Sequence, residues 1–146
     1  EKMSSSSHLG FRVDAIHLPP DAKGTVTRDE ARKIFSAEQV EAALACFLAG
    51  RRDVWETLLL RLKELREALQ ESNWFRGHEL VGSSLLFVLD AASPHNTAGV
   101  YMIDFAHAIP SPTPLSHRTV WVPGNHEEGY LTGLDALIDM WELTHT

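Results

Sequence analysis

Apolar residues recur at helical spacing in the middle of the chain and predict two amphipathic helices. The first has one apolar stripe, formed by Val40, Leu44, Phe47 and Leu48. Its start is predicted at Ser36, which lies three residues before Gln39 as in a capping box, and its end at Gly50. The second helix has an apolar face made of Leu58, Leu62, Leu65 and Leu69. Because one face of each helix is apolar, the two are expected to pack as a small helical unit.

Two further pairs at capping-box spacing predict helix starts. Thr27 lies three residues before Glu30, and Asp53 lies three residues before Glu56. The polar residues 4–8 show no apolar periodicity, so we expect them to be flexible.

The second half of the chain predicts a hairpin and one more helix. An unbroken apolar run from Leu85 to Leu89 is typical of a strand covered on both faces. A polar loop over residues 90–99 leads to a second strand, Val100–Ile103, which ends at Asp104. From about Glu127 the spacing is helical again, with a buried face predicted at Leu134, Leu137, Ile138 and Trp141. Helices with one hairpin make the expected fold class α+β.

Composition narrows the class of protein. The length of 146 residues favours one domain, and 44% hydrophobic residues suffice for a core. A net charge of -7 argues against a broad basic surface for nucleic acid, yet a few side chains can still form a local anion pocket. The single cysteine, Cys46, excludes a disulfide scaffold. No apolar run approaches the ~20 residues of a membrane span, and the first residues do not resemble a secretory signal, so a cytoplasmic location is expected.

Asp104 and Ser84 are the first candidates for chemistry. A carboxylate held at a strand end is a good ligand for Mg²⁺, which binds few protein oxygens and shares the rest with phosphates and water. The alternative for Asp104 is a carboxylate that caps a turn or pairs with an arginine. The hydroxyls of Gly82-Ser83-Ser84 could bind a phosphate or a metal-bound water, or could simply form a turn before the strand.

The basic residues Arg12, Arg28, Arg32 and Lys33 are a second group of candidates. Guanidinium and ammonium groups suit phosphate oxygens, although an ordinary solvated helix face is the alternative. The eight histidines are scattered and lack the spacing of a zinc site, and no serine-hydrolase elbow occurs.

Several short stretches occur in an order that resembles the inositol polyphosphate kinase family. They are Leu9-Gly10-Phe11-Arg12, His78 to Phe87, Met102-Ile103-Asp104-Phe105 and Glu128-Gly129-Tyr130-Leu131. The segment Leu115-Ser116-His117-Arg118, with Trp121 and Gly124-Asn125, is similar to the inositol 1,4,5-trisphosphate 3-kinase branch. The likeness covers nearly the whole chain.

The resemblance implies a protein-kinase-like fold with a helical insert that binds inositol phosphates. Residues 1–146 would be a partial catalytic domain belonging to its C-terminal lobe. The helical substrate-binding lobe would span about 9–75, and the hairpin, metal-site strand and last helix about 78–146.

The resemblance also assigns roles to the candidate residues. Asp104 and Ser84 would bind Mg²⁺ and the ATP phosphates, and Arg12 would bind a substrate phosphate. A second substrate contact falls on Arg32 or Lys33, and the choice stays open. The implied reaction transfers the γ-phosphoryl of ATP to the 3-hydroxyl of inositol 1,4,5-trisphosphate, a step in calcium signalling.

Two departures from the family qualify these expectations. Ala106-His107 after Asp104-Phe105 is more like the multikinase and hexakisphosphate kinase branches, which leaves the substrate range open. The P-x-x-x-D-x-K-x-G motif, which supplies the family's catalytic aspartate, and the ATP-binding small lobe do not occur in this sequence. We therefore expect the chain to be the C-terminal part of a kinase, inactive alone and with apolar hairpin surface exposed. Its partners would be the missing N-terminal part or a regulator such as calmodulin.

Two other classes of protein stay open. The chain could be a non-catalytic module that binds inositol phosphates, or a helical interaction protein without anion binding.

Overall fold

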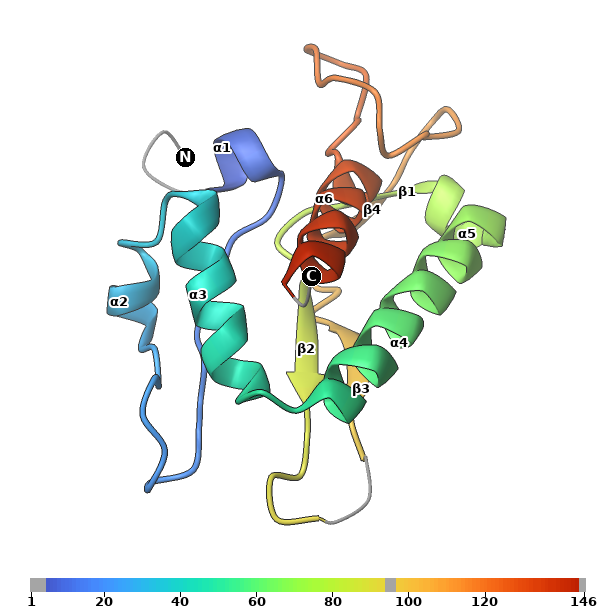
Figure 1. Ribbon diagram of the computed structural model, residues 1–146. Helices are drawn as coiled ribbons and strands as arrows, with labels where there is room; N and C mark the ends of the chain where they lie inside the picture. The colour runs from blue at the N-terminus through green and yellow to red at the C-terminus, as the bar shows by residue number, and fades with distance from the viewer. Residues whose placement is uncertain (1–4, 94–96, 145–146) are drawn as a thin grey trace.

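The computed structural model describes residues 5–93 and 97–144 and confirms the α+β class (Figure 1). The helices are α1 (Ser6–Leu9), α2 (Arg28–Ala31), α3 (Ala37–Leu48), α4 (Arg52–Glu71), α5 (Asn73–Arg76) and α6 (Tyr130–Leu143). The strands are β1 (His78–Leu80), β2 (Ser84–Val88), β3 (Gly99–Ile103) and β4 (Ala108–Pro110). They form two antiparallel pairs, β1 with β4 and β2 with β3. None of the described helices has the length and apolar character that crossing a bilayer requires.

The predicted capping boxes at α2 and α3 are confirmed. The Thr27 hydroxyl accepts the Glu30 N–H at 3.3 Å, and the Glu30 carboxylate accepts the Thr27 N–H at 2.8 Å. Ser36 and Gln39 make the same reciprocal pair at the start of α3. These bonds satisfy amides that the first helical turn leaves without partners, so each helix begins where the sequence predicts.

The predicted capping box at Asp53 is wrong. Helix α4 begins at Arg52, and its N-cap is Arg51, whose side chain makes no capping hydrogen bond to the first turn. Asp53 therefore lies inside the first turn, where its carboxylate is 2.8 Å from Nη2 of Arg51. The side chain pairs with this arginine, so the spacing to Glu56 has no capping role.

The main core lies where α4 and α6 cross beside the β2–β3 hairpin (Figure 1). The predicted faces are buried at Leu58, Leu62 and Leu69 of α4 and at Leu134, Leu137, Ile138 and Trp141 of α6. Two tryptophans join the helices reciprocally: Trp55 Nε1 donates to the Trp141 carbonyl at 2.8 Å, and Trp141 Nε1 donates to the Trp55 carbonyl at 3.2 Å.

A smaller cluster packs residues 13–34 onto α3. Ile16, Leu18 and Ala43 are buried in it, with Val26 and Ile34 partly buried beside them. The backbones of Ile16 and Val26 exchange two hydrogen bonds, of 2.9 and 2.8 Å, which fold this segment back on itself. It lies with α2 and α3 to one side of the hairpin (Figure 1).

Helix α1 corrects the expectation that residues 4–8 are flexible; residue 4 lies outside the described residues. Ser6–Leu9 form one helical turn, and the fully buried Ser5 donates its hydroxyl to the Phe11 carbonyl at 2.9 Å. Gly10 ends the turn at φ +79° and lies directly against Gly133 of α6, where a Cβ on either residue would meet the other's backbone.

Gly133→Ala is therefore expected to destabilise the fold, although alanine normally favours a helix by about 1 kcal/mol over glycine. The added methyl would overlap the Gly10 carbonyl, which is backbone and cannot rotate away. Over-packing of this kind costs about 1–3 kcal/mol. Denaturant midpoints measure the effect, with Asp139→Ala on the exposed side of α6 as control. A Gly133→Ala chain more stable than the parent would contradict the close approach.

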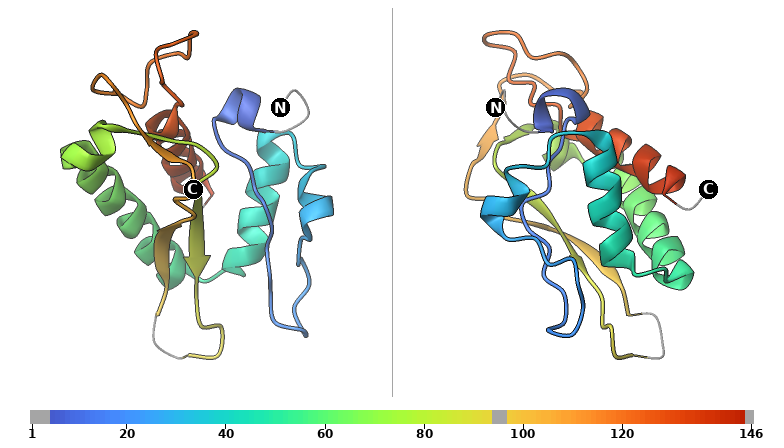
Figure 2. Two further views of the ribbon diagram at one scale, coloured as in Figure 1. Left: turned by 180° about the vertical axis from the view of Figure 1, so that it is seen from behind. Right: turned by 60° about the vertical axis from the view of Figure 1, so that its left-hand side comes forward.

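The predicted β2–β3 hairpin is confirmed. The prediction that its first strand is covered on both faces is wrong, because one face of the hairpin is exposed. Leu85 and Phe87 of β2 and Val100 and Met102 of β3 pack against the core. The other face carries Leu86 and Val88, each 45% exposed. Seen from behind, the hairpin lies in front of α6 (Figure 2, left). The expectation that the hairpin exposes apolar surface is thus confirmed. Residues 94–96 of its loop lie outside the described residues.

Candidate functional site

The open face of the hairpin combines apolar side chains with polar groups at one end. Residues directly opposite each other in an antiparallel pair point to the same face, and here Ser84 pairs with Ile103 and Leu86 with Tyr101. Leu86, Tyr101 and Ile103 are 45%, 58% and 39% exposed. Exposed apolar side chains gathered on one strand pair are typical of a binding surface. The Ser84 hydroxyl lies at the end of this face.

Asp104 directly follows Ile103, the strand partner of Ser84, so its backbone lies at the same end of the hairpin as Ser84. Its φ of +66° is in the left-handed region, and it turns the chain out of β3 into a turn closed by the Ala108 N–H on the Phe105 carbonyl at 3.0 Å. The residue is exposed, and no hydrogen bond or ion pair to another described residue engages its carboxylate. Neither the cap nor the arginine pair that the sequence left open is found among these contacts.

The donor set at this edge fits part of a magnesium site. A carboxylate and a hydroxyl supply the oxygen ligands that Mg²⁺ prefers, and this ion commonly takes only one or two protein carboxylates beside phosphates and water. Within residues 5–93 and 97–144, no group of three or more His, Cys, Asp or Glu side chains could hold a metal ion. The edge thus suits a metal that is held jointly with a phosphate ligand.

The predicted basic residues lie in residues 12–48, which include α2 and α3 and are called the helical part below. Exposed acids pair with two of these basic residues. Arg12 Nε is 3.0 Å from Asp14, and Arg32 is 3.6 Å from Asp29. Such exposed pairs contribute about 0–1 kcal/mol, so a phosphate can displace the acid. Arg28 lies in α2 and Lys33 just after it.

Neighbours of two of these basic residues pack against the same apolar cluster. Val13, next to Arg12, and Ile34, next to Lys33, both pack against the cluster formed by Ile16, Leu18 and Ala43. Among the described contacts, none joins the basic residues to Ser84 or Asp104.

An aromatic group beside Asp104 was not predicted. Trp74 of α5 stacks on His78 with ring centroids 4.2 Å apart, and Phe105 meets the Trp74 ring edge-on at 6.2 Å. These contacts connect the residue after Asp104 to the end of the long helix α4. The sequence shows the three residues but no spacing that pairs them.

Sequence reasoning also missed a buried charged network around His117, which is 1% exposed. Its Nδ1 lies 2.6 Å from Oε1 of Glu128, and its Nε2 lies 2.7 Å from the Phe75 carbonyl. The Phe75 ring stacks on the imidazole at 3.8 Å. Glu127 accepts the His117 backbone N–H at 2.8 Å. A lone histidine in Ser116-His117-Arg118 carries no spacing signal, so only the fold reveals these contacts.

The pKa of His117 is raised above its ordinary value of 6.5. Burial lowers this pKa and is the largest single influence, but the hydrogen bonds to Glu128 and the Phe75 carbonyl, together with the charges of Glu128 and Glu127, outweigh it. Burial raises the pKa of Tyr130 to about 12; the nearby Ser83 hydroxyl lowers this pKa, and the charge of Glu128 adds a smaller increase. The hydroxyls of Ser83 and Tyr130 are buried without a hydrogen bond of good geometry.

The raised pKa predicts that the protein loses stability as the pH rises. A histidine with a higher pKa in the folded than in the unfolded chain stabilises fully below the unfolded value. That contribution disappears as the pH rises from about 6.5 through the folded-state pKa. The free energy of unfolding, measured by denaturant titration at several pH values, should fall over this window. In His117→Gln the fall should be absent, and an equal fall in this variant would contradict the assignment.

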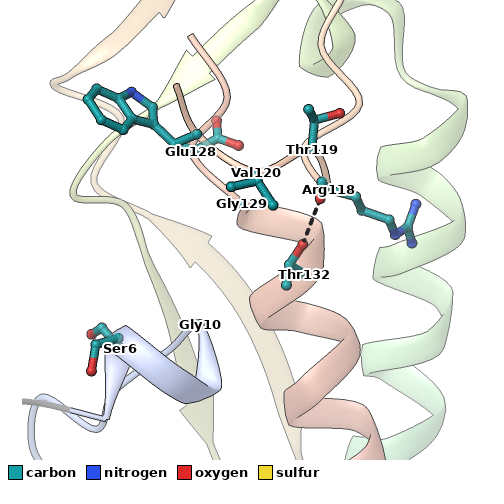
Figure 3. A pocket seen from close by; sticks show the side chains of 10 residues that line it. Ser6, Gly10, Arg118, Thr119, Val120, Glu128, Gly129 and Thr132 are labelled. Carbon is teal, nitrogen blue, oxygen red and sulfur yellow. Dashed lines mark hydrogen bonds between the residues drawn. The ribbon is translucent and has the colours of Figure 1, made fainter. Parts of the chain in front are cut away.

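A cleft of about 520 Å³ lies elsewhere, between α1, the start of α6 and residues 118–121 (Figure 3). Its charged groups are already paired: Arg118 binds Asp135 at 2.7 Å, and Glu128 binds His117. Figure 3 shows the Arg118 side chain directed away from the cleft toward α4. None of the residues predicted for chemistry lines it, so the hairpin edge is the better candidate site.

Comparison with known proteins shows which family this chain resembles. The family profile described as inositol polyphosphate kinase matches residues 1–142. An inositol-trisphosphate 3-kinase homolog of Caenorhabditis elegans is 39% identical over 145 residues, which are 97% of this chain and 28% of the relative. Inositol-trisphosphate 3-kinase A of Rattus norvegicus is 43% identical over 140 residues, covering 94% and 29%, and inositol-trisphosphate 3-kinase C of Mus musculus is 44% identical, covering 94% and 20%. The chain thus spans less than a third of the length of these relatives.

Proposed function

The chain belongs to the inositol polyphosphate kinase family, and we propose that it forms part of a kinase domain that phosphorylates inositol 1,4,5-trisphosphate at the 3-hydroxyl with ATP. The observation that carries this proposal is the exposed carboxylate of Asp104, which no other described residue engages and which comes directly after Ile103, the strand partner of Ser84. The similarity to inositol-trisphosphate 3-kinases over nearly the whole chain supports the choice of substrate.

In this proposal the hairpin binds the nucleotide. The exposed side chains of Leu86, Tyr101 and Ile103 offer a flat apolar surface for the adenine ring. Asp104 and Ser84 would hold Mg²⁺ and the ATP phosphates. When bound, Mg²⁺ neutralises the charge that develops on the transferred phosphoryl group. The hairpin, packed on α4 and α6, keeps the two oxygen ligands on a rigid element.

The substrate would bind on the helical part. Arg12, with Arg32 or Lys33, would bind the phosphates of the inositol ring, since all three are exposed and the acids that pair with Arg12 and Arg32 among the described residues are exposed too. The proposed lobes run over about residues 9–75 and 78–146, although α4, at the end of the first, packs against α6 of the second. The protein-kinase-like arrangement, like these boundaries, is part of the proposal.

The direct test places this chain in a larger kinase. The 140 residues of Rattus norvegicus inositol-trisphosphate 3-kinase A that match are replaced by the corresponding residues of this chain. We expect the purified chimera to transfer phosphate from ATP to inositol 1,4,5-trisphosphate in a Mg²⁺-dependent reaction, and the 146-residue chain alone to show no turnover. A chimera with native circular dichroism that binds ATP but phosphorylates no inositol phosphate would overturn the proposal.

Arg12→Ala in this chimera is expected to raise KM for inositol 1,4,5-trisphosphate about tenfold or more, the size expected for one charge-assisted bond of about 1.5–3 kcal/mol. The KM for ATP should stay the same, because the hairpin binds the nucleotide. Steady-state kinetics with each substrate varied measures both. Arg28→Ala serves as the matched control, since it removes a neighbouring arginine that the proposal leaves unused. Equal effects of both variants would argue for a diffuse electrostatic role.

The same assays decide between this function and its alternatives. Comparable turnover of inositol phosphates with more phosphates would favour a multikinase-type activity, in keeping with Ala106-His107. Tight binding of inositol trisphosphate by the chain alone, without any activity in the chimera, would favour a non-catalytic binding module. Calmodulin regulation is tested by adding calcium-loaded calmodulin to the chimera.

A further inference from the structure

Both ring nitrogens of His117 lie against oxygen acceptors, and this fixes its charge. Nδ1 is 2.6 Å from Oε1 of Glu128, and Nε2 is 2.7 Å from the Phe75 carbonyl. The two Glu128 oxygens also accept the backbone N–H groups of Leu80 and Tyr130, as an ionised carboxylate does. A neutral imidazole carries only one N–H, so both contacts are hydrogen bonds only when His117 is an imidazolium.

Each charged group around the His117 ring is either an acid or a cation that already has a partner. Glu127 and Glu128, from the segment before α6, both bind His117. The other ionisable groups on the surrounding elements are Arg76 of α5, His78 of β1, the phenol of Tyr130, and the ion pairs Glu79–His126 and Arg118–Asp135. In the described chain the imidazolium is thus the cation that balances the two buried carboxylates.

One arm of the network leads to Ser84. The second oxygen of Glu128 holds the Leu80 N–H at 2.8 Å, at the end of β1. Only residues 81–83 separate Leu80 from Ser84, the first residue of β2. The position of Leu80 therefore limits where β2 begins.

The other arm leads to Asp104. Nε2 of His117 binds the carbonyl of Phe75 in α5, and the preceding Trp74 packs against Phe105, the residue after Asp104. This contact and the turn after Phe105 hold the left-handed backbone that presents the Asp104 carboxylate. The imidazolium thus connects the two sides of the hairpin edge through separate contacts.

We propose that His117 is a positioning residue, whose charged ring sets the placement of Ser84 relative to Asp104. The inference rests on the proposed function, because that edge is where Mg²⁺ and the nucleotide phosphates are proposed to bind. Loss of the proton removes one of the two ring hydrogen bonds and frees either β1 or α5. The two oxygen ligands then shift relative to each other, although His117 touches neither of them.

The test is a nuclear magnetic resonance titration of the 146-residue chain across the pH range in which histidines titrate. The backbone amide signals of Ser84 and Asp104 should shift with the same midpoint as the His117 ring. The amide of Val26, on the helical part, should not follow this midpoint. In His117→Gln the common shift of Ser84 and Asp104 should disappear.

Three control variants separate His117 from the other histidines near this edge. His107→Gln removes the imidazole closest in sequence to Asp104, His126→Gln removes the one paired with Glu79, and His78→Gln removes the one stacked on Trp74. The common titration must persist in all three. Amides of Ser84 and Asp104 that follow another histidine, or that do not titrate, overturn the proposal. If His117→Gln does not fold, the parent chain and these three controls still decide.

Binding of Mg²⁺ and ATP to the chimera separates this inference from the proposed function. Coupled titration in the chain together with a chimera that binds no nucleotide at any pH contradicts the proposed function and leaves the coupling established. A chimera that binds Mg²⁺ and ATP, together with a chain that shows no coupled titration, contradicts the role of His117 alone.

Discussion

Asp104→Asn is expected to reduce phosphoryl transfer by the chimera about 10²- to 10³-fold, the range for loss of one electrostatic stabiliser of a transition state. The substitution keeps the shape of the side chain and removes the charge that would bind Mg²⁺. Because Arg12 and its neighbours lie on the helical part, KM for inositol 1,4,5-trisphosphate should change little. The loss should therefore appear in kcat and in the Mg²⁺ concentration that the reaction needs.

The backbone at Asp104 makes this variant informative about function rather than folding. Asparagine adopts left-handed conformations such as the φ of +66° here more readily than most residues, so the folded state should be kept. Denaturant midpoints of the parent and Asp104→Asn should agree. Asp139→Asn, which neutralises an exposed carboxylate on α6, is the matched control and should keep full activity. Equal activity of the two variants would exclude Asp104 from the metal site.

Local sequence patterns predicted the parts of this fold that short-range bonds determine. The boxes at Thr27 and Ser36 depend on residues three positions apart, and the hairpin depends on two apolar runs joined by a polar loop. The same register placed Ser84 beside the end of the strand that leads to Asp104. The candidate site was therefore within reach of the sequence.

The missed features depend on contacts between distant residues. His117 binds Glu128, 11 residues away, and Phe75, 42 residues away, and no spacing rule relates these positions. The box predicted at Asp53 was wrong because the neighbouring Arg51 binds its carboxylate. Whether the hairpin is covered on both faces depends on what packs against it, which a run of apolar residues does not specify.

Trp141→Ala is expected to lower the free energy of unfolding by about 3–5 kcal/mol, the cost of removing a large aromatic side chain from a core. Trp141 is fully buried, and its ring stacks on Phe87 of the hairpin with centroids 5.3 Å apart. It also exchanges hydrogen bonds with Trp55 of α4. One side chain thus joins α6 to both α4 and β2, and no neighbour can fill the cavity without moving a helix.

Two further variants separate the contributions of Trp141. Trp141→Phe keeps an aromatic ring against Phe87 but loses the donor to the Trp55 carbonyl, so it should cost less than alanine, with about 1 kcal/mol assigned to the hydrogen bond. Trp121→Ala removes a tryptophan that is 63% exposed and should stay within about 0.5 kcal/mol of the parent. Denaturant unfolding followed by circular dichroism measures all three. Because the hairpin edge depends on this core, Trp141→Ala should also weaken binding of Mg²⁺ and ATP, whereas Trp121→Ala should not. Equal denaturant midpoints for these two variants would contradict the packing of α6 on the hairpin.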